Sequence, residues 1–199
     1  MKKLVIISAA LLGLTACSFT FENKPTYKTT PPTNIRVDLK VGWDNEEIGL
    51  VEVVDNDVYI NIYQKDSYEN SYFAHFDNGS YVYYKKDVMH EGVWESFVPT
   101  ATNPENMTTL DAINSLNSLV SSAYSNIFNV DLINGVKSSE TGLVLNIETT
   151  VHKVKNKTYW YFEGINMFLK IYDDSEKELS CEVTSYQYYR HFDDSPFLK

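Results

Sequence analysis

The residue types that most often do chemistry are thinly spread through this sequence of 199 residues. His90 and Glu91 begin like the zinc-binding helix of a metalloprotease, in which a second histidine follows four residues after the first. Trp94 occupies that position here, so the ligand pair is incomplete, and we interpret His90 as an exposed loop residue. The other histidines are His75, His152 and His191.

Other catalytic and metal-binding signatures are missing from the sequence. It has no Gly-x-Ser-x-Gly nucleophile elbow, no phosphate-binding loop and no calcium-binding loop. Asp173, Asp174 and Glu176 could together meet a cation, although an acidic turn between strands is usually only solvated. The sequence therefore predicts a protein that is not an enzyme and that uses no metal or cofactor.

The clearest chemical signal lies at the N-terminus, where two lysines precede an apolar run from Leu4 to Leu14. Such a run behind a positive start is typical of an export signal, and it is too short to span a bilayer comfortably. The tetrapeptide Leu14-Thr15-Ala16-Cys17 resembles the lipobox of bacterial lipoproteins, in which the signal is removed and the cysteine is acylated. This resemblance implies a signal peptide over residues 1–16 and a lipid on Cys17. The alternative is an ordinary secretory peptide followed by a chance cysteine.

An acylated Cys17 would fix the protein at a membrane surface. Two or three acyl chains hold a protein for practical purposes permanently, because each buried methylene contributes about 0.8 kcal/mol. No second apolar run of about 20 residues follows Cys17. We therefore expect a bacterial membrane protein that is anchored through lipid and that faces outside the cytoplasm.

Charge and cysteine content narrow the classes of partner. Loss of residues 1–16, which include two lysines, leaves 183 residues with 15 basic and 27 acidic side chains. Such an acidic surface argues against nucleic acid as a partner. If Cys17 is lipidated, Cys181 has no disulfide partner, and its alternation with Leu179 and Val183 favours a buried thiol over a reactive or metal-binding one.

Three regions follow from the patterning of the chain. Residues 17–34 contain the lipidated cysteine and a Thr/Pro-rich stretch that is typical of a flexible tether. Residues 35–199 form one β-rich domain, whose first strand alternates apolar and polar residues from Ile35. A hairpin is predicted at Asn78-Gly79, because these residues tolerate the backbone of a tight turn. Between the two groups of strands, apolar residues recur at three- and four-residue steps and predict one amphipathic helix over about residues 106–128, with Thr108 and Asp111 as a capping pair.

These elements predict an α+β, mainly β fold, in which one main helix packs on a strongly curved antiparallel sheet, an incomplete barrel of about 9–10 strands. The strands carry an unusual load of 15 tyrosines, placed on both faces. One interpretation is that these rings only reflect the high β propensity of tyrosine. The other is that a cavity or groove for an apolar partner lies among them.

The lipobox, the tether, the interrupted meander and the closing pattern Met167 to Asp174 and Glu178 to Val183 resemble the LolA/LolB/LppX superfamily. Those proteins fold as a U-shaped incomplete barrel whose helices cover an apolar cavity, and they carry acyl chains or lipids. The resemblance implies a ligand-binding site made of a lid face, with Leu110, Ile113, Leu116 and Val120, and of inward aromatic residues, with Trp94, Trp160 and Phe162.

The sequence therefore predicts a membrane-anchored lipoprotein that binds a lipid or an acyl chain in the hollow of the sheet. The alternative is an envelope interaction or scaffold lipoprotein, which contacts protein or glycan through exposed aromatic residues and has no cavity.

Overall fold

The computed structural model of the chain describes residues 25–28, 30–42, 47–64, 69–87, 92–99, 107–138, 140–192 and 194–197. The predicted signal peptide and Cys17 lie outside these residues, as does His90. No helix in the described part of the chain is long and apolar enough to cross a membrane.

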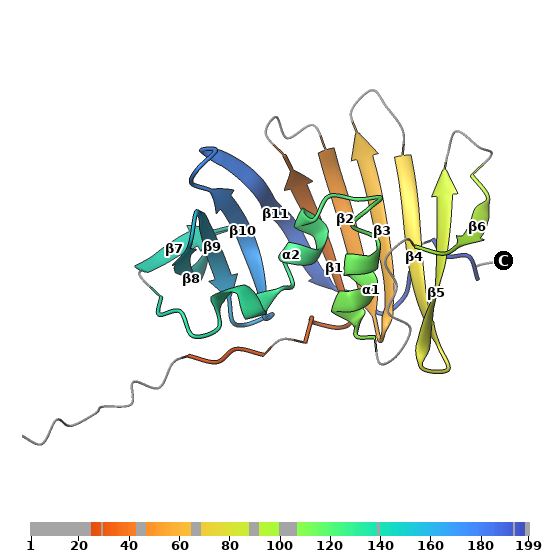
Figure 1. Cartoon of the computed structure of the whole chain (residues 1–199), viewed down its shortest axis with the longest axis horizontal. Coiled ribbons are helices and arrows are strands. Elements are labelled where there is room, and N and C mark those ends of the chain that lie inside the picture. Colours follow the sequence, from red (N-terminus) through yellow and green to blue (C-terminus); the bar gives the residue numbers. More distant parts are fainter. Residues whose placement is uncertain are drawn as a thin grey trace, which may run out of the picture.

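One antiparallel sheet of eleven strands forms the body of the protein (Figure 1). Its strands are β1 (Ile35–Val41), β2 (Glu47–Val54), β3 (Asp57–Gln64), β4 (Glu69–Asp77), β5 (Ser80–Asp87), β6 (Trp94–Phe97), β7 (Glu140–Val144), β8 (Ile147–Val154), β9 (Lys157–Phe162), β10 (Met167–Asp173) and β11 (Glu178–Tyr188). The mainly β, antiparallel architecture that the sequence predicts is confirmed, with slightly more strands than the expected 9–10.

The sheet joins two meanders through its central pair of strands. Strands β1 to β6 follow one another on one side, β11 back to β7 on the other, and β1 pairs with β11. The sheet does not close, because β6 and β7 are its two edges. Asn78 and Gly79 have positive φ angles of 49° and 88° in the β4–β5 turn, so the predicted hairpin is confirmed.

The helical segment covers one face of this sheet but is not the single helix expected over about residues 106–128. It consists of α1 (Thr109–Ser115), α2 (Ala123–Asn126) and a 3-10 turn, η2 (Val130–Ile133). The prediction of one continuous helix was wrong because Asn and Ser, which compete with the backbone for hydrogen bonds, fill the gap between α1 and α2. There Asn117 Nδ2 donates to Ser125 Oγ at 3.2 Å. The predicted capping pair is confirmed, since the Thr108 hydroxyl accepts from Asp111 N and the Asp111 carboxylate accepts from Thr108 N.

Side chains fill the space between the helical segment and the sheet. Ile113, Leu116 and Tyr124 are fully buried there. The Tyr124 ring lies directly against the backbone of Gly49 in β2, where a Cβ would stand 2.6 Å from Tyr124 Cζ. The apolar face of β1 completes this core, with Ile35, Val37, Leu39 and Val41 all buried.

The C-terminal segment, residues 189–192 and 194–197, crosses the opposite face of the sheet behind β3, β4 and β5 (Figure 1). The Phe192 ring packs edge-on against Phe73, with ring centroids 4.9 Å apart. Asp194 accepts hydrogen bonds from Lys86 Nζ and from Trp94 Nε1. Both faces of this half of the sheet are therefore covered by the chain itself.

Candidate functional site

Residues 25–28 and 30–34, which we call the strap, pass along one end of the sheet, below the ends of β9, β10 and β11 (Figure 1). Hydrogen bonds from the strap's backbone, both accepted by its carbonyls and donated by its amides, hold it to the domain. Gly135 N donates to Pro25 O at 2.9 Å, and Tyr27 N donates to Asn134 Oδ1 at 2.7 Å. Residues 25–28 and 30–34 of the predicted tether are therefore bonded to the domain, and the rest of the tether lies outside the described residues.

Asn166, in the turn between β9 and β10, fixes the middle of the strap. Its Nδ2 donates to the carbonyls of Lys28 and Thr30, at 3.1 Å and 2.9 Å. Its Oδ1 accepts from the Tyr161 hydroxyl at 2.9 Å. Asn166 takes a positive φ of 54°, a conformation that asparagine tolerates better than most residues. One amide side chain thus ties the strap to β9 and to the turn.

A groove of about 700 Å³ lies between the strap and the β9–β10 turn. Tyr27, Pro31, Pro32, Tyr161, Ile165 and Tyr188 give it aromatic and aliphatic walls. Lys28, Glu163, Asn166 and several threonines supply its polar rim. Its volume falls within the range of about 300–1,000 Å³ that is usual for small-molecule sites, and its lining mixes these apolar walls with a polar rim of similar size. We call it the strap groove.

Two of the tyrosines that line the strap groove, Tyr27 and Tyr161, have raised pKa values. Burial, and secondarily the charge of Glu163, raise the pKa of Tyr161 to about 12. The same two causes raise the pKa of Tyr27. The rings meet edge to face with centroids 4.8 Å apart. The two rings therefore offer neutral apolar surface, while the Tyr161 hydroxyl donates to Asn166 Oδ1 in the turn.

His152 lies buried beneath the strap, and its environment lowers its pKa below the usual value of 6.5. Burial is the main cause, because it disfavours the charged imidazolium, and the backbone of Val136 opposes it. The Tyr27 hydroxyl is 3.5 Å from His152 Nε2, and the Tyr27 ring meets the imidazole edge-on. The strap thus packs on a neutral histidine.

Stability is expected to fall as the pH drops below about 6.5, since the unfolded state then binds a proton at His152 that the folded state excludes. The slope in this window is at most about 1.4 kcal/mol per pH unit, and the stabilisation is fully present above pH 6.5. Urea unfolding between pH 5 and pH 7 measures it. His152→Phe, which keeps the ring packing but cannot titrate, should flatten the curve; parallel curves for both proteins would contradict this assignment.

The predicted lid residues pack into the core instead of around a hollow. Ile113 and Leu116 are fully buried and Val120 is 7% exposed, while Leu110 packs half-buried against the same core. They face the sheet, as the sequence predicts, but none of them lines the strap groove.

The three predicted cavity aromatics lie in separate places. Trp94 is on the face opposite the helices, with its ring 6.2 Å from Phe73 and beneath Lys86 Nζ at 5.2 Å. Trp160 alternates with the buried Tyr159 and Tyr161, and its half-buried indole lies over Gly142 of β7. Phe162 contacts Gly164, which itself lines the strap groove. The structure therefore does not bring these rings together.

Sequence reasoning missed Tyr27, Asn134, His152 and Asn166, the residues that build the strap site. A tyrosine within an otherwise polar, proline-rich stretch was the available signal for the strap. Nothing in the local spacing relates Asn166 to Lys28, which are 138 positions apart.

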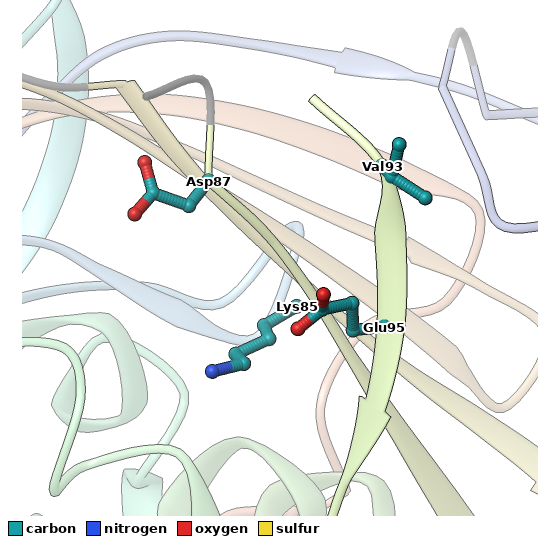
Figure 2. Close-up of a pocket in the computed structure, with 4 residues that line it drawn as sticks. All are labelled: Lys85, Asp87, Val93 and Glu95. Carbon is teal, nitrogen blue, oxygen red and sulfur yellow. The ribbon is translucent and has the colours of Figure 1, made fainter. Parts of the chain in front are cut away.

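A smaller apolar groove of about 210 Å³ lies beside β5 and β6, between Tyr81, Tyr83, Phe97 and Met107. Its volume is below the usual range for a ligand site. A third hollow, of about 280 Å³, is drawn in Figure 2. Lys85 and Glu95 are paired positions of β5 and β6, Asp87 is the last residue of β5, and Val93 comes just before β6. Opposite charges on exposed strand positions give this hollow no distinct ligand chemistry.

The acidic turn after β10 has a structural use. Asp173 Oδ1 accepts from the Ser175 and Glu176 amides, at 3.0 Å and 3.2 Å, and the Ser175 hydroxyl bond holds the pKa of Asp173 below its usual value. Within the described ranges, no group of three or more His, Cys, Asp or Glu side chains is placed to hold a metal ion.

Cys181 is fully buried, and burial raises its pKa to about 12.

Comparison with known proteins adds no relative to this geometry: no family model matches the chain, and no curated protein matches it either.

Proposed function

We propose that this protein is a lipoprotein of the bacterial cell envelope, anchored through Cys17, that binds an apolar chain such as an acyl group in the strap groove. The observation that carries the proposal is the strap groove itself, about 700 Å³ between the strap and the β9–β10 turn. An acyl chain would lie against Tyr27, Ile165 and Tyr188, and Lys28 at the rim would meet an anionic head group.

The site differs from the one that the resemblance to the LolA/LolB/LppX superfamily implies. An open antiparallel sheet with a helical segment on one face supports that resemblance, and we include a strongly curved, barrel-like sheet in the proposal. The space beneath α1 and α2, however, is filled by the packed core. The ligand in this proposal therefore binds at the end of the sheet, where the strap forms one wall of the groove and opens to admit it.

Lipid binding can be tested on the secreted Cys17→Ala protein, purified without detergent. We expect native mass spectrometry to find co-purifying lipid, and a fluorescent fatty acid to bind. Tyr188→Asp should weaken that binding about tenfold, because a carboxylate would then replace an exposed ring at the groove wall.

Leu143→Asp is the matched control. Leu143 is 72% exposed on the edge strand β7, outside the strap groove, so the same kind of change should leave fatty acid affinity unaltered. A clean apo mass with no uptake of fatty acid would overturn the ligand proposal. It would favour the alternative, a scaffold lipoprotein that contacts protein or glycan.

A further inference from the structure

We infer that the strap turns one end of the sheet, the end with the β9–β10 turn and the strap groove, toward the membrane surface and holds it there on a short spacer. The inference rests on the proposed acylation of Cys17. To the proposed anchor it adds that the strap end of the domain contacts the lipid bilayer.

Chain length carries the first step. Seven residues separate Cys17 from Pro25, the first residue of the docked strap. At about 3.6 Å per residue, this connection reaches at most about 30 Å. With the strap undocked as far as Ile35, the same estimate gives about 65 Å. Docking of the strap therefore halves the distance that the domain can move away from its anchor.

The second step is where the docked chain leaves the domain. Pro25 is bonded to Gly135, after η2, and Asn34 O accepts from Tyr189 N beside the end of β11. Both contacts are at the end of the sheet where β9 turns into β10 (Figure 1). The opposite end, with the β10–β11 turn, is about 20 Å further away, because β10 has seven residues at about 3.3 Å each. Because the spacer from Cys17 joins the domain at the strap end, that end lies nearer the membrane than the opposite end does.

The side chains at the strap end suit an interfacial position. Tyr188 is 76% exposed at the groove wall, and tyrosine is enriched at the level of lipid head groups. Lys28 and Lys137 are exposed there beside the exposed carboxylates of Asp55, Asp131 and Glu163. This mixed set of charges gives no net attraction to anionic lipid, so contact depends on the strap and the anchor. The strap groove then opens close to the bilayer, from which a lipid chain would enter.

The test uses the full acylated chain in vesicles of phosphatidylethanolamine and phosphatidylglycerol that carry an energy-transfer acceptor on their head groups. Glu163→Cys and Lys177→Cys place a thiol in the β9–β10 turn and in the β10–β11 turn. A fluorophore attached to that thiol reports its distance from the bilayer. Cys181 should not compete for the label, because it is fully buried and its pKa is raised. We expect at least about twofold more transfer from position 163 than from position 177, given strands about 20 Å long.

Two further variants test the role of the strap. An insertion between Lys24 and Pro25 that doubles the spacer leaves the fold untouched and should reduce transfer from position 163. Asn166→Ala with Tyr27→Ser should do the same by releasing the strap, with circular dichroism as the check on folding. Equal transfer from the two positions, or no response to the insertion, would overturn the orientation.

Vesicle flotation separates this inference from the proposed anchor. Flotation that is lost in Cys17→Ala, together with equal transfer from the two labels, would overturn the orientation alone. A wild-type protein that does not float would overturn the anchor and the orientation together, and would leave fatty acid binding by the Cys17→Ala protein as a separate result.

Discussion

Gly49→Ala is expected to destabilise the protein by about 2 kcal/mol or more, although glycine in a strand interior is normally a weak point. The added methyl would overlap the ring of Tyr124, a residue of α2 that is fully buried against the sheet. Overfilled cores cost about 1–3 kcal/mol, which outweighs the gain of up to about 1 kcal/mol from a less flexible unfolded chain. Urea unfolding of the Cys17→Ala protein measures the change.

Gly142→Ala is the control for this prediction. Its methyl would meet Trp160 Nε1 at 2.8 Å, but Trp160 is half-buried beside an edge strand and its indole can shift. We therefore expect a smaller loss than at Gly49. Tyr124→Leu should relieve the clash, so that the double variant with Gly49→Ala is more stable than the sum of the two single changes predicts. Equal losses at both glycines, or additive effects in the double variant, would show that Tyr124 is not seated against β2.

Deletion of residues 190–199 is expected to cost about 4 kcal/mol and to expose an aromatic surface, since loss of a single buried phenylalanine ring already costs about 3–5 kcal/mol. The deletion removes Phe192 and Phe197, whose rings cover Phe73 at centroid distances of 4.9 Å and 6.0 Å. It also removes Asp194, the partner of Lys86 and Trp94. Thermal unfolding and binding of an apolar dye such as anilinonaphthalene sulfonate measure the two effects.

A shorter deletion separates this packing from a general effect of losing the terminus. Removal of only residues 198 and 199 keeps Phe192, Asp194 and Phe197, and should leave both the unfolding temperature and dye binding unchanged. If the longer deletion were equally harmless, the C-terminal segment would not contribute to the fold, and Phe73 and Trp94 would be candidates for a partner surface after all.

The C-terminal segment explains why some aromatic residues of the strands are buried. Tyr59 and Phe73, which alternate with apolar residues that face the helices, are 6% and 1% exposed because the chain's own C-terminus lies on them. Exposed aromatic residues do remain elsewhere, with Tyr63 at 48% and Tyr188 at 76%. Of these two, Tyr188 belongs to a groove.

The sequence by itself determined the local elements. Alternation in Ile35–Val41 specifies one buried face, because successive side chains of a strand point to opposite sides. Asn78-Gly79 specifies a tight turn, because both residues accept a positive φ. Thr108 and Asp111 specify a helix start, because each side chain satisfies the backbone of the other residue. All of these signals act within a few residues of one another.

The tertiary structure alone decided the site and the two outer coverings. The strap and the C-terminal segment have no periodic pattern, and their partners lie far away in the sequence: Tyr27 meets His152 across 125 positions, and Lys86 meets Asp194 across 108. Such a segment docks only where the folded sheet presents exposed aromatic rings and hydrogen-bonding side chains that match it. The end of the predicted helix was decided in the same way, by the packing of Tyr124 against Gly49 and by Asn and Ser side chains that bond across the gap. The spacing of residues in the sequence does not predict these contacts, because they form only once the eleven strands are in register.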